Sequence, residues 1–189
     1  MNHKELAEAI FKVSNLKGEF HLRSGQISNE YFDKYLFECQ PEILKSIANE
    51  MSKMVPSGID VLAGLEMGGI PIATMISHMT GIPAAFVRKK QKEYGTCKLA
   101  EGGNVENKKV LVIEDVVTSG GQIIESVKQL RNFGAIITKV LCVIDRESGG
   151  KENLKQNDLS LLPLFSMSEL HAASAKLSLQ QTTRAERPW

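Results

Sequence analysis

The most informative part of the chain is Val110 to Gln122, VLVIEDVVTSGGQ. Its apolar beginning predicts a buried strand over residues 110–113, and an acidic pair, Glu114-Asp115, follows directly. The glycines near its end predict a turn into a helix, which the apolar spacing extends over residues 122–133. A buried strand that runs through a glycine turn into a helix is typical of proteins in which helices cover a parallel sheet.

The turn in this stretch has the composition of an anion site. Thr118, Ser119, Gly120 and Gly121 are small, and backbone N–H groups at a helix N-terminus suit a phosphate. The two acids would repel that phosphate, so we expect them to accept hydrogen bonds from sugar hydroxyls or to help hold a divalent cation. We therefore predict a ribose phosphate site. The alternative is an ordinary helix with Thr118 or Ser119 as its N-cap and the acids merely exposed.

Working outward, apolar runs alternate with segments of helical periodicity, which predicts an α/β fold with a central, mostly parallel sheet flanked by helices. The predicted strands cover residues 59–63, 84–87, 136–144 and 161–165. The other predicted elements are helices over 4–13, over 69–79 and from Pro41 onward, a hairpin or extended loop over 19–33, and a long loop over 88–105.

Length and composition predict a single domain. The chain has 189 residues, a formal charge of +1 and 42% hydrophobic residues. We expect one domain over residues 1–177 and a poorly ordered tail over 178–189. The near-zero net charge argues against nucleic-acid binding over a broad surface, and no apolar run is long enough to span a membrane. The charged beginning of the chain lacks the apolar core of a signal peptide, and three widely spaced cysteines predict free thiols in the cytoplasm.

The stretch over 110–122 resembles the phosphate-binding motif of type I phosphoribosyltransferases, and that resemblance implies their fold. It implies that Glu114 and Asp115 contact the ribose hydroxyls of phosphoribosyl pyrophosphate. It also implies that the backbone and hydroxyl groups that follow hold the 5′-phosphate. These are Val116, Val117, Thr118, Ser119, Gly120, Gly121 and Gln122.

A basic loop narrows the resemblance to the orotate phosphoribosyltransferase family. Residues 86–102, FVRKKQKEYGTCKLAEG, are similar to the family's flexible catalytic loop. The resemblance implies that Arg88, Lys89 and Lys92 contact pyrophosphate, with Lys92 as the catalytic residue, and that the loop reaches the neighbouring site of a homodimer. Tyr94 stands where the family often has His; a phenol could still donate a hydrogen bond there. The alternative for an isolated charge run is a solvated loop.

A glycine-containing turn, GLEMGGIP over residues 64–71, resembles the family's pyrophosphate loop. The resemblance implies contacts from Glu66 and Met67 and a cis peptide near that pair. Many relatives carry Lys at the next position, where this chain has Gly68. An ordinary strand-to-helix turn is the alternative.

The segment FHLRSGQISNEYF, residues 20–32, resembles the N-terminal hood of the same family, which we expect mainly over residues 18–36. The resemblance implies that Arg23, Tyr31 and Phe32 lie near orotate, together with Thr118. It also implies that Arg146 faces the orotate carboxylate. Taken alone, the two aromatic residues would be assigned to the core, Arg23 to the surface and Arg146 to a local ion pair with its acidic neighbours.

The resemblance, which covers about residues 5–170, implies transfer of ribose 5-phosphate from phosphoribosyl pyrophosphate to orotate. It implies a Mg²⁺ cofactor held mainly by the substrate, with Asp115 as the candidate protein ligand. One alternative is a related enzyme that acts on a purine base. Another is a non-catalytic regulator that senses phosphoribosyl pyrophosphate.

Overall fold

The computed structural model describes residues 1–21, 25–89 and 99–175. Its helices are α1 (His3–Ser14), α2 (Tyr35–Glu38), α3 (Pro41–Met54), α4 (Gly69–Thr80), α5 (Gly121–Asn132) and α6 (Gly150–Lys155). Its strands are β1 (Asn15–His21), β2 (Ile27–Phe32), β3 (Val61–Leu65), β4 (Ala84–Val87), β5 (Ala100–Gly102), β6 (Val110–Val117), β7 (Lys139–Asp145) and β8 (Ser160–Ser166). Residues 167–175 form a further helix.

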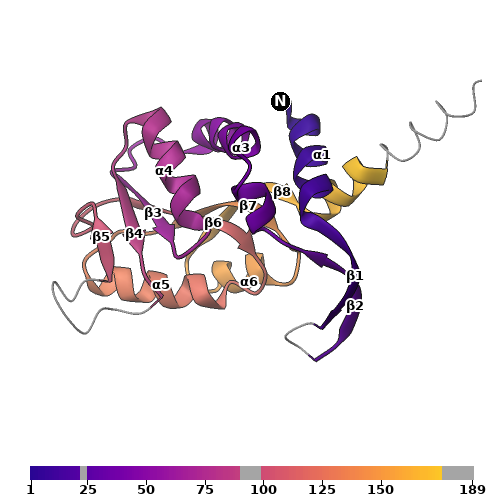
Figure 1. The fold of residues 1–189 in the computed structure, drawn as a ribbon. Coiled ribbons are helices and arrows are strands. Elements are labelled where there is room, and N and C mark those ends of the chain that lie inside the picture. Colours follow the sequence, from indigo (N-terminus) through magenta and orange to yellow (C-terminus); the bar gives the residue numbers. More distant parts are fainter. Residues whose placement is uncertain (22–24, 90–98, 176–189) are drawn as a thin grey trace, which may run out of the picture.

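Six strands form one sheet in the order β5-β4-β3-β6-β7-β8, and all pairs except β4 with β5 are parallel. Figure 1 shows α3 and α4 over one face of this sheet and α5 and α6 below the other. This arrangement confirms the predicted α/β fold with a mostly parallel sheet. Because helices cover both faces, every residue of the central strand β3 is buried.

Local sequence signals account for several helix ends. Asn2 and Glu5 form a reciprocal capping box at the start of α1. Pro41 occupies the first turn of α3, where its missing N–H has no intrahelical partner to lose. Two apolar clusters then hold the layers together. One joins the sheet to α1, α3 and α4, and the other joins the opposite face to α5.

Several predicted elements differ from the structure. The strand expected over 59–63 is β3, which lies two residues later, and the strand expected over 136–144 is β7, which begins three residues later. The strand expected over 110–113 continues through the acidic pair to Val117. The loop expected over 88–105 contains the short edge strand β5. Residues 167–175, for which we predicted no helix, bury Leu170 and Ala173 against the core.

Of the two structures expected for residues 19–33, the hairpin is the one present: β1 and β2 form an antiparallel pair that extends away from the body of the molecule on the side of β8 (Figure 1). We call this hairpin, with the residues that lead to α2, the hood. The hairpin begins at Asn15, and α2 begins at Tyr35. The Asp33 N–H donates to Ser14 O at 2.8 Å, which ties the base of the hairpin to the end of α1.

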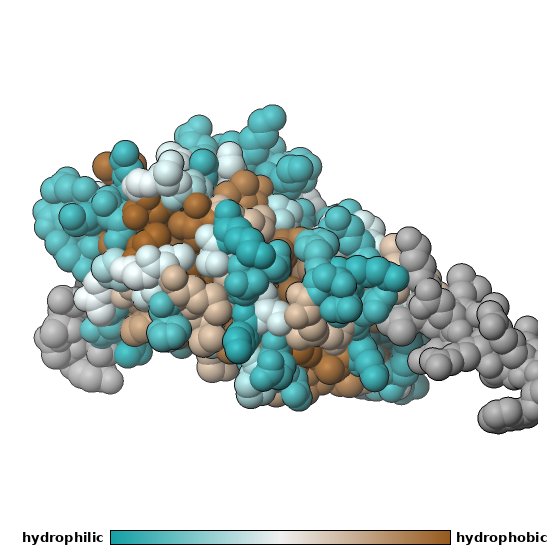
Figure 2. Space-filling view, turned by 90° about the horizontal axis from the view of Figure 1, so that it is seen from above, coloured by the Kyte–Doolittle hydropathy of each residue, from teal (hydrophilic) through white to brown (hydrophobic). Residues whose placement is uncertain are grey.

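The face seen from above in Figure 2 carries apolar surface around α4, surrounded by polar residues. Met79 of α4 is 38% exposed, and its neighbour Met75 is partly buried. In the part of the chain that the structure describes, no helix combines the length and the apolar character needed to cross a membrane.

Candidate active site

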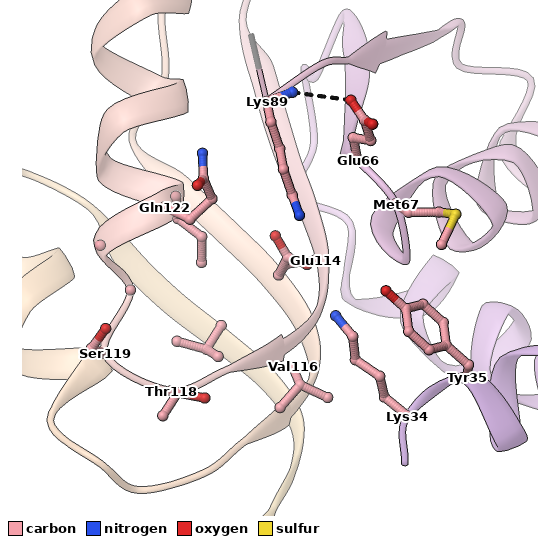
Figure 3. A pocket seen from close by; sticks show the side chains of 14 residues that line it. Lys34, Tyr35, Glu66, Met67, Lys89, Glu114, Val116, Thr118, Ser119 and Gln122 are labelled. Atoms are coloured by element: carbon pink, nitrogen blue, oxygen red, sulfur yellow. Dashed lines mark hydrogen bonds between the residues drawn. The ribbon is translucent and has the colours of Figure 1, made fainter. Parts of the chain in front are cut away.

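The carboxyl end of β6 opens into a pocket of about 380 Å³, which is large enough for a small nucleotide-like ligand. We call it the cradle pocket (Figure 3). It brings together most of the residues that the motifs singled out on three separate segments. They are Glu66, Met67, Lys89, Glu114, Val116, Val117, Thr118, Ser119, Gly120, Gly121 and Gln122.

The floor of the cradle pocket is the start of α5. Gly120 is the N-cap residue, with φ of 76°, and no side chain caps the helix. The alternative in which Thr118 or Ser119 is the N-cap is therefore wrong. Their hydroxyl groups are exposed toward the pocket, and the N–H groups of the first helical turn have no carbonyl partners within the helix. An anion is the natural ligand for such a turn.

The acidic pair divides between two environments, because successive side chains of a strand point to opposite sides. Glu114 is half-buried and lines the cradle pocket. Asp115 is completely buried behind it, and its Oδ2 lies 2.5 Å from Nζ of Lys34. The Lys34 ammonium also lies 5.3 Å from the centre of the Tyr35 ring.

Among Lys34, Glu38, Glu114 and Asp115, the charged form is favoured for Asp115 and Lys34. Burial opposes charge on Asp115, but contacts with the Glu114 carboxyl and the Lys34 ammonium outweigh it and lower the pKa of Asp115. Burial and the adjacent Asp115 carboxylate raise the pKa of Glu114, and the same two causes raise the pKa of Glu38 to about 8. Burial would lower the pKa of Lys34, but the interactions with Asp115 more than compensate and raise it.

The turn after β3 forms the opposite wall of the cradle pocket. The cis peptide expected near Glu66 and Met67 is confirmed between these two residues. The Glu66 carboxylate accepts a hydrogen bond of 3.1 Å from the Lys89 N–H, and the Lys89 side chain points into the pocket (Figure 3). Arg88 differs from this neighbour: it does not line the pocket, and its Nε lies 3.8 Å from Glu101 Oε1.

A second pocket of about 440 Å³ lies between the hood and the ends of β6 and β7, and we call it the hood pocket. It contains Tyr31, Phe32 and Arg146, which the sequence placed near one ligand. Tyr31 is 45% exposed rather than a core residue, and its ring lies 5.5 Å from that of Phe20. The remaining lining residues are Asp33, Lys34, Tyr35, Val116 and Thr118.

Arg146 is available to a ligand. Its backbone N–H donates to Val117 O at 2.9 Å, which fixes the residue beside the end of β6. Its acidic neighbours are engaged elsewhere, since Asp145 accepts from the Glu147 N–H and Glu147 accepts from Ser168. The alternative of a local ion pair is therefore absent among the described residues.

Arg23, Lys92 and Tyr94 lie outside the described residues, so their placement stays a prediction. The structure adds Lys34 and Tyr35, which line both pockets and which the motifs did not identify as site residues. Their only sequence signal was their position within the expected hood, directly after the aromatic pair.

Comparisons with known proteins agree with this geometry. A family model described as the phosphoribosyl transferase domain matches residues 38–162. The chain is 51% identical to the orotate phosphoribosyltransferase of a Nocardioides species over 168 residues, which cover 89% of this chain and 94% of the relative.

Solved structures share the fold. The orotate phosphoribosyltransferase of Mycobacterium tuberculosis in complex with Fe(III) dicitrate matches with a TM-score of 0.82 and 29% identity, over 90% of this chain and 99% of that one. The same enzyme in complex with 5-phospho-alpha-D-ribosyl 1-diphosphate matches with a TM-score of 0.78 and 28% identity, with the same coverage of both chains. The domain match, the sequence identity and the shared fold show that the chain belongs to the orotate phosphoribosyltransferase family.

Proposed function

We propose that the protein transfers ribose 5-phosphate from phosphoribosyl pyrophosphate to orotate, which yields orotidine 5′-monophosphate and pyrophosphate in the synthesis of UMP. The observation that carries this proposal is that the cradle pocket and the hood pocket meet, with Lys34, Tyr35, Val116 and Thr118 lining both. A donor in one pocket and an acceptor in the other would face each other at this junction. Relatives that bear the name of this activity add support.

The donor fits the cradle pocket. Its 5′-phosphate would bind at the start of α5, where the backbone from Val117 to Gly121 and the hydroxyls of Thr118 and Ser119 line the pocket. Glu114 would accept hydrogen bonds from the ribose hydroxyls. The pyrophosphate would then extend toward Lys89 and the Glu66-Met67 turn, where Arg88, Lys92 and Tyr94 of the catalytic loop would join it.

The acceptor fits the hood pocket. An arginine fork matches the geometry of a carboxylate, and Arg146 is exposed on the wall of this pocket with its acidic neighbours engaged elsewhere. Tyr31 and Phe32 would cover the planar ring, with Arg23 over the opening. In this arrangement the base lies beside Thr118, next to the ribose of the donor.

The chemical difficulty lies in the bond between C1′ and the pyrophosphate oxygen. As this bond breaks, positive charge grows on the ribose and negative charge on the pyrophosphate. The orotate nitrogen then forms its bond to C1′ and loses its proton, for which the released pyrophosphate is an acceptor. Cations around the leaving group, Lys89 and the proposed catalytic residue Lys92, would stabilise that charge. Closure of the loop would keep water from the activated sugar.

We propose that a magnesium ion is held chiefly by oxygens of the substrate. Asp115, the candidate protein ligand, is buried and paired with Lys34. Glu114 is the member of the acidic pair that faces the cradle pocket. When bound, Mg²⁺ would neutralise charge on the pyrophosphate.

We also propose a homodimer and a cytoplasmic location. The apolar surface around α4 supports a contact between subunits, and light scattering in solution would measure the assembly (Figure 2). Cys39 and Cys142 are free thiols, which is typical of a reducing compartment.

Absorbance assays of the purified protein with phosphoribosyl pyrophosphate and Mg²⁺ test the function. We expect consumption of orotate and none of adenine, guanine or xanthine. Consumption of a purine instead would show a related transferase with different specificity. Binding of phosphoribosyl pyrophosphate without any turnover would show a sensor. The exposed Arg146 favours orotate over a purine, because purines carry no carboxylate.

A further inference from the structure

Lys34 lies where the two pockets join. It directly precedes α2, and its side chain lines both the cradle pocket and the hood pocket. Figure 3 shows its ammonium group pointing into the cradle pocket, on the opposite side of Glu114 from the end of Lys89. A ligand that spans from the phosphate site to the junction would pass beside this ammonium.

The ion pair between Lys34 and Asp115 is accessible from one side only. Nζ and Oδ2 lie 2.5 Å apart, yet the Asp115 side chain is 0% exposed while that of Lys34 is 33% exposed. An ammonium group has three N–H donors, and one carboxylate oxygen occupies only one of them. Asp115 is therefore the buried member of the pair, and the accessible Lys34 ammonium keeps N–H donors that a ligand can use.

Gly68 leaves the space that the Asp115 carboxylate occupies. A Cβ atom at position 68 would overlap Asp115 Oδ2 and would lie 2.6 Å from Glu38 Oε1. Any side chain at this position would therefore displace Asp115. The absence of a side chain at Gly68 leaves the Asp115 carboxylate in place beside the Lys34 ammonium.

We propose that Lys34 binds the phosphoribosyl donor through its pyrophosphate oxygens, and that Asp115 is a positioning residue for Lys34. Asp115 then has no direct contact with the ribose, which leaves Glu114 as the acceptor for the ribose hydroxyls. This proposal rests on the proposed function and refines it. The competing explanation is that Lys34 only neutralises a buried carboxylate and has no contact with substrate.

A double-mutant cycle separates the two explanations. We expect Lys34→Gln to lower kcat/KM for phosphoribosyl pyrophosphate by about 10–100-fold, the range for loss of one charge-assisted hydrogen bond, with a smaller change in the KM for orotate. Asp115→Asn should cause a similar loss. The double variant should be no worse than either single variant, because both remove the same contact. Lys34→Arg should restore part of the donor affinity, since it returns the positive charge.

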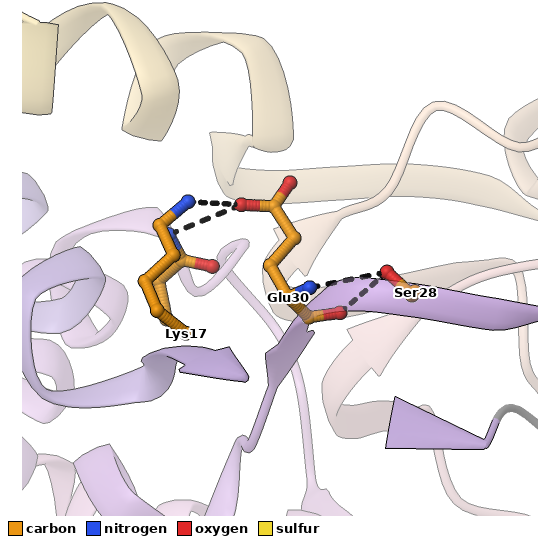
Figure 4. Close-up of polar contacts among 4 residues, drawn as sticks. Lys17, Ser28 and Glu30 are labelled. Atoms are coloured by element: carbon orange, nitrogen blue, oxygen red, sulfur yellow. Dashed lines mark hydrogen bonds and ion pairs between the residues drawn. The ribbon is translucent and has the colours of Figure 1, made fainter. Parts of the chain in front are cut away.

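Lys17 provides a matched control on the hood. Its Nζ lies 2.5 Å from Glu30 Oε2, the same separation as in the Lys34 pair, but here both side chains are accessible, at 73% and 44% exposure (Figure 4). Lys17→Gln should leave both KM values and kcat unchanged. Each variant is first checked for its unfolding transition, and donor binding is also measured directly by calorimetry.

Three results would overturn the proposal. If the fold-losses in kcat/KM of the two single variants multiply in the double variant, Asp115 contacts the donor independently of Lys34. Unchanged donor binding by a folded Lys34→Gln protein would show that the ion pair has only a structural role. Equal increases in the KM for orotate and in the KM for phosphoribosyl pyrophosphate would show a general disturbance of the site. Failure of the proposed function is distinct, because it would appear in the wild-type protein as absence of orotidine 5′-monophosphate.

Discussion

Glu114 and Asp115 are joined by a hydrogen bond of 3.2 Å, from the Asp115 N–H to Glu114 Oε1, yet only Glu114 reaches the cradle pocket. The strand β6 continues through both residues, and the alternation of a strand sends their side chains to opposite sides. Two acids that look equivalent in the sequence therefore have different surroundings. Glu114 lines the cradle pocket, and Asp115 forms a buried ion pair with Lys34.

Removing the carboxyl group that faces the pocket should weaken the donor site. We expect Glu114→Ala to lower kcat/KM for phosphoribosyl pyrophosphate by about 10-fold, since a hydrogen bond left unmade costs about 1–3 kcal/mol. Steady-state kinetics with the donor varied would measure this loss. Glu125→Ala, an exposed change on α5, is the control and should behave as wild type. A Glu114→Ala enzyme with unaltered donor kinetics would remove this residue from the site.

The left-handed turn at Gly120 should be needed for the phosphate site. Its φ is 76°, and an added Cβ would lie 3.2 Å from Leu154 Cγ, so Gly120→Ala combines backbone strain with crowding at the start of α5. We expect a lower stability and a higher KM for phosphoribosyl pyrophosphate.

Gly81→Ala is a matched control for this change. Gly81 has φ of 73° at the end of α4, and its Cβ would meet nothing within 4 Å. It should lose about 1–2 kcal/mol of stability from the same backbone strain while the donor KM stays constant. If both alanine variants raised the KM equally, global destabilisation would explain the effect.

Glu38 should make stability depend on pH. Its pKa is raised from 4.5 to about 8 by burial and by the Asp115 carboxylate. Between these values the folded protein retains a proton that the unfolded chain has released, so stability falls as pH rises through this window, by up to about 1.4 kcal/mol per pH unit. Glu38→Gln stays neutral in both states, and it should therefore gain stability relative to wild type between pH 5 and pH 8.

Urea unfolding at several pH values would measure this difference. Glu42→Gln, an exposed change on α3, serves as the control and should follow the wild-type profile. Parallel pH profiles for the Glu38→Gln and wild-type proteins would contradict the assignment of a neutral Glu38 carboxyl at neutral pH.

Lys92 is proposed to act on the leaving pyrophosphate. We expect Lys92→Ala to lower kcat by about 10²-fold or more, with a much smaller effect on substrate binding, because its charge would matter most as the bond to pyrophosphate breaks. Single-turnover kinetics would separate chemistry from product release. The exposed Lys108 provides a control in Lys108→Ala. Wild-type turnover in Lys92→Ala would exclude the residue from the mechanism.

Local patterns in the sequence were sufficient to predict the centre of the fold. The stretch around Glu114 combines a continuous apolar run with a glycine turn, and both are short-range signals. They correctly predicted a strand, a turn and the helix α5. They misplaced the end of β6, because a charged pair normally marks the end of a buried strand. Here Lys34, far away in sequence, stabilises Asp115 inside the core.

Non-local contacts explain what the sequence could not predict. The strand β5 has only three residues and exists through its pairing with β4. No sequence motif contains Lys34, because its contact with Asp115 arises only when the segment after the hairpin folds back toward β6. Most motif residues did converge on two pockets, whereas Arg88 pairs with Glu101 away from both.

The most direct test of the account is the stoichiometry of one reaction. Purified protein is mixed with orotate, phosphoribosyl pyrophosphate and Mg²⁺, and the products are separated and identified by mass spectrometry. We expect orotidine 5′-monophosphate and pyrophosphate in equal amounts, with neither formed when orotate is omitted. Release of pyrophosphate without the nucleotide, or no product at all from folded protein that binds the donor, would contradict the proposed transfer.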